Sequence, residues 1–118
     1  QATFNNCIIY GSATNEFNLS KSANAAFVYQ LNNCLLKFSS STTNPDYQFK
    51  TDAVHYNNII LNENPKYFNV NQNKLNIDKT SAAFAKGNQA YTIPLDILGI
   101  TRTSPPDLGA YQSKDFPK

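Results

Sequence analysis

The chain has 118 residues, a formal charge of +2 and only 15% charged residues. This length allows one domain with a modest core. The weak charge excludes a strongly electrostatic partner such as nucleic acid or an anionic membrane surface, and no apolar run approaches the length of a membrane-spanning helix. The sequence begins at Gln1, a few residues before its first repeat, and we expect a C-terminal piece of a longer protein.

Asparagine is the unusual component, with 17 of the 118 residues. Asn tolerates the left-handed backbone conformation and hydrogen-bonds its own turn, so it suits tight corners. A chain rich in Asn could also be disordered. The aliphatic runs and the 13% of aromatic residues argue for a folded chain instead.

A short phrase occurs three times in the first half of the chain, at residues 4–9, 31–36 and 56–61. Each copy has a large apolar residue, an Asn pair and three small or aliphatic residues. The pairs begin at Asn5, Asn32 and Asn57, so the spacing is 27 and then 25 residues. Regular repetition at this spacing is typical of stacked repeats. We therefore predict an all-β, right-handed parallel β-helix of about three coils over residues 1–61, with an Asn ladder at its corners.

Strand side chains alternate between two faces, so each aliphatic run has an inner and an outer set. The inner set contains Cys7, Ile9, Cys34, Leu36, Ile59 and Leu61. The outer set includes Ile8, Leu35 and Ile60, an aliphatic stripe that should not face water. We expect the C-terminal segment or another chain to cover this stripe.

The two cysteines, Cys7 and Cys34, hold the same place in successive repeats. Stacked positions on neighbouring strands lie about 4.8 Å apart, slightly more than the Cβ separation that a disulfide prefers. We favour two reduced, buried thiols rather than a disulfide, with Ile59 at the equivalent position of the third repeat. Both interpretations stay open. There is no CxxC motif and His55 is the single histidine. We predict no metal and no cofactor.

The repeat ends after Leu61, and residues 62–118 have a different character. Repeat folds need an atypical terminal unit, because an open end would template further strand pairing. We predict that 62–118 is a C-terminal capping segment, in one domain with 1–61.

Several motifs resemble those of a known family. They are Asn6–Ser12 (NCIIYGS), Phe27–Leu36 (FVYQLNNCLL), the turn at Asn64–Phe68 and the segment Leu75–Gly87. The closing motif contains Asp96, Gly99, Arg102, Pro106, Asp107, Gly109, Ala110 and Tyr111. With these, nearly the whole chain resembles the C-terminal region of secreted right-handed parallel β-helix proteins of Bacteroidetes-type bacteria, in the pectate-lyase-like superfamily.

The departures from the family pattern are local. Residues 81–85 lack its Pro and Asp, and Gln112 replaces its final Glu. The resemblance implies a secreted, periplasmic or cell-surface protein that handles carbohydrate. The family's active residues lie on earlier coils, so no catalytic residue carries over.

The candidate site residues are few. Exposed aromatic rings can stack on sugar faces, and the tyrosines in or near loops are Tyr10, Tyr47, Tyr67 and Tyr91. We interpret Arg102 and Asp107 as residues that fix the cap rather than as a ligand pair. His55 lacks a neighbouring nucleophile or further metal ligands, so we expect a structural or merely exposed histidine.

Three functions stay in view. We favour a non-catalytic scaffold or cap of a secreted or surface protein that contributes to glycan binding. One alternative is part of a polysaccharide lyase or glycoside hydrolase whose groove lies on coils outside this sequence. The other is an adhesion or assembly module. The expected partners are the remaining coils of a parent chain, a second copy at the open end, or a polysaccharide.

Overall fold

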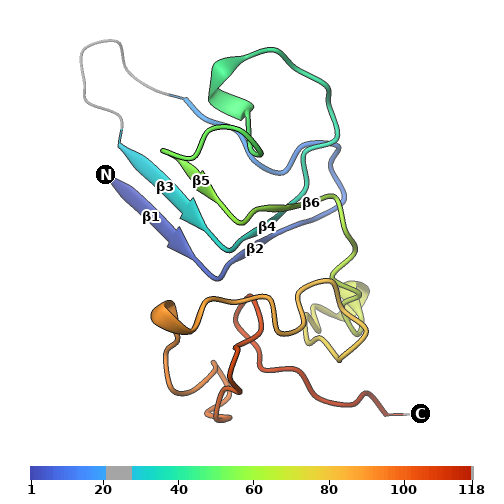
Figure 1. The fold of residues 1–118 in the computed structure, drawn as a ribbon. Helices are drawn as coiled ribbons and strands as arrows, with labels where there is room; N and C mark the ends of the chain where they lie inside the picture. Colours follow the sequence, from blue (N-terminus) through green and yellow to red (C-terminus); the bar gives the residue numbers. More distant parts are fainter. Residues whose placement is uncertain (21–27, 118) are drawn as a thin grey trace.

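The computed structural model describes residues 1–20 and 28–117. The elements in this part are β1 (Ala2–Asn5), β2 (Ile8–Ile9), β3 (Tyr29–Asn32), β4 (Leu35–Leu36), η1 (Pro45–Tyr47), β5 (Tyr56–Asn57), β6 (Ile60–Leu61), η2 (Val70–Gln72) and η3 (Gln89–Tyr91). β1, β3 and β5 form one parallel sheet, and β2, β4 and β6 form a second (Figure 1). No helix in these described ranges is long and apolar enough to cross a membrane.

The prediction of a right-handed parallel β-helix is wrong. The described chain is mostly irregular, and its two small sheets neither close nor curl round into coils. The strands of the second sheet have only two residues each. Long connections such as residues 37–55 separate the repeats, and their Ser, Thr, Asn and Pro residues favour turns over strands. Residues 37–55 form a loop with one short 3-10 helix, so the repeat builds two short ladders that meet at a corner.

The Asn pairs form that corner. Asn6, Asn33 and Asn58 have φ angles of 56°, 55° and 55°, a left-handed conformation that Asn tolerates better than other residues with a Cβ. The preceding Asn of each pair points into a hydrogen-bonded ladder. Asn32 Nδ2 donates to Asn5 Oδ1 at 2.9 Å, and Asn57 Nδ2 donates to Asn32 Oδ1 at 2.9 Å.

The inner faces of both sheets pack against aromatic side chains from the loops and from the first residues of β3 and β5. The predicted inner residues Cys34, Leu36 and Ile59 are buried there, with Cys7, Ile9 and Leu61 at the margin. The aromatic partners are Phe17, Tyr29, Phe38, Tyr47, Phe49 and Tyr56. Edge-to-face pairs such as Phe49 and Tyr56, 4.8 Å between ring centres, fill the space between the loops and the sheets. The predicted inward parity is therefore confirmed.

The outer face of the second sheet is covered by the C-terminal half. Leu35 is fully buried against Ile77, Ala83 and Leu108, and Ile8 and Ile60 pack beside it. Burying a leucine side chain stabilises the fold by roughly 1.5–3 kcal/mol. The expectation that the C-terminal segment covers this stripe is confirmed, and Figure 1 shows that segment, yellow to red, beneath the strands.

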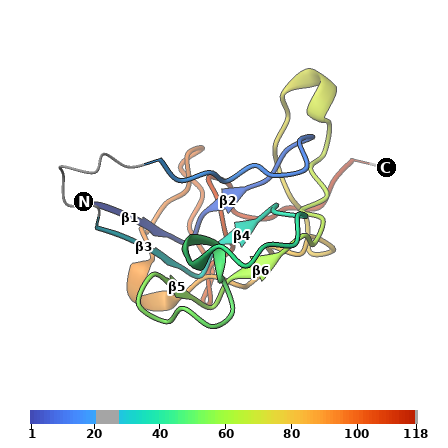
Figure 2. The same ribbon diagram turned by 90° about the horizontal axis from the view of Figure 1, so that it is seen from above.

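The strand order leaves two edges. β1 and β2 lie at one edge of the two sheets, and β5 and β6 lie at the other (Figure 2). We call these the β1–β2 edge and the β5–β6 edge.

Candidate binding groove

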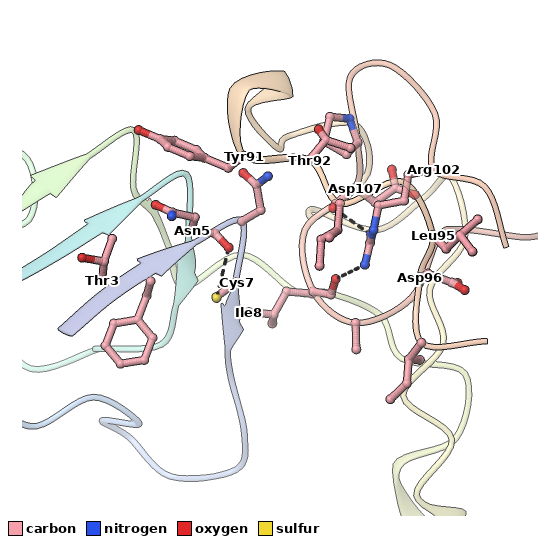
Figure 3. A pocket seen from close by; sticks show the side chains of 17 residues that line it. Thr3, Asn5, Cys7, Ile8, Tyr91, Thr92, Leu95, Asp96, Arg102 and Asp107 are labelled. Carbon is pink, nitrogen blue, oxygen red and sulfur yellow. Dashed lines mark hydrogen bonds between the residues drawn. The ribbon is translucent and has the colours of Figure 1, made fainter. Parts of the chain in front are cut away.

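A groove of about 770 Å³ runs along the β1–β2 edge. One wall is formed by residues 3–8, which include most of β1, the Asn corner and the start of β2. The opposite wall comes from residues 91–97 and from residues between 102 and 110 (Figure 3). The groove therefore joins the first repeat to the last quarter of the chain.

The strand wall presents backbone groups. Asn6 N–H donates to the Asn32 carbonyl of the neighbouring repeat at 3.0 Å. Backbone groups of successive strand residues point alternately to the two sides, so the Thr3 and Asn5 N–H groups face the groove. Asn5 Oδ1 is used by the ladder, and within the described ranges nothing accepts from its Nδ2. This wall is a sheet edge without a partner strand among the described residues, and it presents backbone donors together with backbone acceptors.

The opposite wall is apolar and exposed. Its exposed apolar residues occupy every second position from 91 to 97: Tyr91, Ile93, Leu95 and Ile97. Ile93 and Ile97 expose 67% and 69% of their surface. Exposed aliphatic residues grouped in this way mark an interaction surface rather than ordinary scatter.

Asn6 anchors the two walls to each other. Asn88 N–H donates to Asn6 Oδ1 at 2.8 Å, and Asn6 Nδ2 donates back to the Asn88 carbonyl at 3.1 Å. Gly109 N–H donates to the Asn6 carbonyl at 2.8 Å. Gly109 has a φ of +89°, and a Cβ there would lie 2.8 Å from Ile8 Cδ1, so only glycine fits.

Asp96 holds the apolar wall in shape. Its Oδ1 accepts from the Leu98 and Ile100 N–H groups, and its Oδ2 accepts from the Gln112 N–H group. Burial alone would raise the pKa of Asp96, but these three donors, helped by the Arg102 charge, hold the pKa below its usual value. The carboxylate is thus fully engaged by backbone.

Asp107 and Arg102 are engaged in the same way. Asp107 is buried, and its two oxygens accept from the Ala85 and Ser113 N–H groups, each at 2.7 Å. Arg102 Nη2 donates to the Gly109 carbonyl at 2.9 Å. Both side chains therefore contact backbone groups of the C-terminal half, and their role in fixing a cap stays a prediction.

Of the four candidate tyrosines, only Tyr91 lines the groove. Tyr10 lies under the Lys37 ammonium, 5.1 Å from the ring centre. Tyr47 stacks on Phe38 in the inner core. Tyr67 packs at the outer core, where burial, and to a lesser extent the nearby Tyr10, raise its pKa. The structure does not bring the four rings together.

His55 lies away from the groove, just before β5. Its Nδ1 is 2.7 Å from Asp52 Oδ2, and its ring stacks on Tyr29 at 4.1 Å. The hydrogen bond from His55 lowers the pKa of Asp52. In the part of the chain that the structure describes, no group of three or more His, Cys, Asp or Glu residues could hold a metal ion.

Sequence reasoning missed both walls of the groove. The signal for the apolar wall was present, since residues 91–97 alternate apolar and other residues as a strand does. The signal for the strand wall was the edge position of the first repeat, which only the pairing order shows.

Comparisons with family models, with curated proteins and with solved structures give no match for this chain.

Proposed function

We propose that this chain is a non-catalytic scaffold module whose β1–β2 edge binds one further repeat unit of the same kind. Such a unit has an extended strand, an Asn corner and a short aliphatic strand. We take its source to be a longer polypeptide that carries the same repeat. The observation that carries the proposal is the groove, which sets an unpaired strand edge opposite an exposed apolar wall.

The three repeats supply the template for this binding. They pair in register, with Asn5 opposite Asn32 and Asn32 opposite Asn57. Each Asn amide donates to the Asn before it. The Asn5 amide therefore points to where the Asn side-chain oxygen of an added unit would accept a hydrogen bond. Backbone pairing along a sheet edge gives affinity, and the side-chain pockets give specificity.

The apolar wall adds the hydrophobic part of the interface. An added strand would place alternate side chains against residues such as Ile93 and Ile97, which are otherwise in water. Burial of this surface is favourable at about 25 cal/mol per Å². The wall thus suits an extended polypeptide better than a sugar chain as the ligand. Of the four candidate tyrosines, Tyr91 alone offers the groove a ring on which a sugar could stack.

The acids of the groove support a non-catalytic role. Both oxygens of Asp96 and of Asp107 accept backbone N–H groups. A glycosidase needs two carboxylates that are free to exchange a proton and to face the substrate. The kinship with pectate-lyase-like proteins, the secreted location and a contribution to glycan binding stay hypotheses.

A peptide tests the proposal. The probe has the sequence of residues 28–37 with serine in place of Cys34, and the matched control also replaces Asn32 by alanine. We expect the probe to bind and to shift the amide NMR signals of residues 3–8. The protein variant Ile93→Lys should weaken binding about ten-fold, since it removes roughly 1.4 kcal/mol of apolar burial. Val54→Lys, at an exposed site outside the groove, should change nothing.

Other outcomes would overturn the proposal. Equal binding of the control peptide would exclude the ladder as the recognition element. Sedimentation of the chain alone could show association that depends on concentration. In that case a second copy of the chain, rather than a longer polypeptide, would occupy the groove. Retardation of the protein in a gel containing one polysaccharide, lost in Tyr91→Ala, would favour a glycan site.

A further inference from the structure

The two cysteines occupy aligned positions on neighbouring strands. β2 pairs with β4 so that Ile8 lies opposite Leu35, and the Leu35 N–H donates to the Cys7 carbonyl at 2.9 Å. Cys7 and Cys34 immediately precede this pair, and both side chains join the inner core. Neighbouring strands lie about 4.8 Å apart, within the range of Cα separations found across disulfides. Both thiols are free in the structure.

The two thiols differ in access. Cys34 is completely buried, whereas Cys7 is half-buried and lines the groove (Figure 3). A small molecule in the groove can therefore reach Cys7 but not Cys34. The Cys34 thiol is reached only through the Cys7 sulfur.

The two thiols also differ in acidity. The neighbouring Cys34 side chain outweighs the effect of burial and lowers the pKa of Cys7 to about 7. The neighbouring Cys7 side chain and burial raise the pKa of Cys34. Each thiol donates to backbone carbonyls, Cys7 to that of Asn5 at 3.3 Å and Cys34 to those of Phe4 and Asn32 at 3.5 Å. The thiolate is the nucleophile in thiol chemistry, so the accessible cysteine is also the reactive one.

We propose that Cys7 and Cys34 are an attacking and a resolving thiol that react with a low-molecular-weight disulfide in the groove to form a cross-strand disulfide. The Cys7 thiolate attacks one sulfur of the small disulfide; its S–S bond breaks and one thiolate leaves. Cys34 then gives up its proton and attacks the Cys7 sulfur, which releases the second thiol. Two electrons pass from the cysteine pair to the small disulfide, and the new bond joins β2 to β4 beside the groove.

Oxidised glutathione is the probe for the test, with intact-mass measurement at neutral pH. We expect the wild-type chain to lose the mass of two hydrogens and to retain no glutathione. Cys34→Ser should retain one glutathione, because the resolving step is lost. Cys7→Ser should not react while folded, because Cys34 is buried. Circular dichroism verifies that each variant is folded.

The rate of the first step tests the influence of the Cys34 side chain on Cys7. Cys34→Ala removes the polar neighbour, so at neutral pH it should form the mixed disulfide more slowly than Cys34→Ser, and the two rates should converge at alkaline pH. The proposal is overturned if folded Cys7→Ser reacts as fast as the wild type, or if the wild type retains glutathione.

Discussion

The two edges of the paired sheets differ in how their backbone groups are used. At the β1–β2 edge, the Thr3 and Asn5 N–H groups face a groove and the ladder ends in an Asn amide. At the β5–β6 edge, the chain covers its own groups. The Tyr56 N–H donates to the Asp52 carbonyl, and Lys50 Nζ donates to the Ile59 carbonyl.

The Lys50 contact takes the place of a hydrogen bond between strands. In the two earlier repeats, the carbonyls of Cys7 and Cys34 accept an N–H group of the following repeat. Lys50 occupies the corresponding position at Ile59. Lysine at a sheet edge is a known way to prevent further strand pairing. The chain therefore ends its strand stack at one edge and leaves it ready for pairing at the other.

The largest difference between the edges should come from the corner asparagines. Asn6 and Asn58 have nearly the same φ, but among the described residues only the Asn6 side chain of the two makes hydrogen bonds, both to Asn88. Asn58→Ala should cost about 1 kcal/mol, the strain of alanine in a left-handed conformation. Asn6→Ala adds the loss of two hydrogen bonds of about 1 kcal/mol each. We expect its free energy of unfolding to fall by about 2–3 kcal/mol.

Urea denaturation of the two variants and of Asn33→Ala measures this comparison. Asn33 shares the left-handed φ, and the structure shows no hydrogen bond of its side chain to another described residue. It should therefore behave like Asn58. Equal losses at Asn6 and Asn58 would mean that the contact with Asn88 contributes nothing to stability.

The local parts of this architecture could be predicted from the sequence. The inward parity of Cys34 and Ile59 and the covered stripe around Leu35 follow from strand alternation and from the need to bury aliphatic side chains. Both depend on neighbours within a few residues or on a repeated register. The contact of Arg102 with backbone carbonyls was also predictable, because this residue lies among turn residues.

The global shape and the groove could not be predicted in this way. A β-helix requires each connection to add a strand, and residues 37–55 form a loop with a 3-10 helix instead. The groove depends on the contact of Asn6 with Asn88, which are 82 residues apart. Nothing in the repeat shows that the first corner, rather than the last, receives the C-terminal segment.

Acid should loosen the groove more than it loosens the β5–β6 edge. The pKa of Asp96 is below its usual value in the folded chain. The ionised carboxylate therefore contributes its full share of folding stability above the pKa of an unfolded Asp. This contribution is lost as the pH falls through the pKa of the folded chain. That window lies below about pH 4. We expect a loss of about 1 kcal/mol there, the worth of weakened hydrogen bonds to the carboxylate. Melting curves against pH measure it.

Asp52 is the matched carboxylate at the other edge, where its pKa is also lowered, first by His55. Its side chain is more exposed than Asp96, so Asp52→Asn should change the acid response less than Asp96→Asn. An Asp96→Asn variant with the wild-type pH dependence would show that this carboxylate does not hold the apolar wall.

A further effect, confined to the β5–β6 edge, should be a new association caused by Lys50→Ala. Without the ammonium, the Ile59 carbonyl and the Asn57 amide oxygen at the β5–β6 edge can accept from the β1–β2 edge of a second copy. This head-to-tail contact does not close on itself, so it would give open chains rather than a dimer. We expect association to strengthen about ten-fold, or roughly 1.4 kcal/mol, in sedimentation velocity.

Lys86→Ala is the control, since it removes the same charge from an exposed side chain that makes no hydrogen bond or ion pair with the described residues. If both variants associate equally, reduced net charge is the cause and the edge argument fails. If Lys50→Ala stays monomeric while its melting temperature is unchanged, the Asp52–Tyr56 turn alone protects this edge. In either case the β1–β2 edge keeps its unpaired donors, so the peptide probe still tests that edge independently.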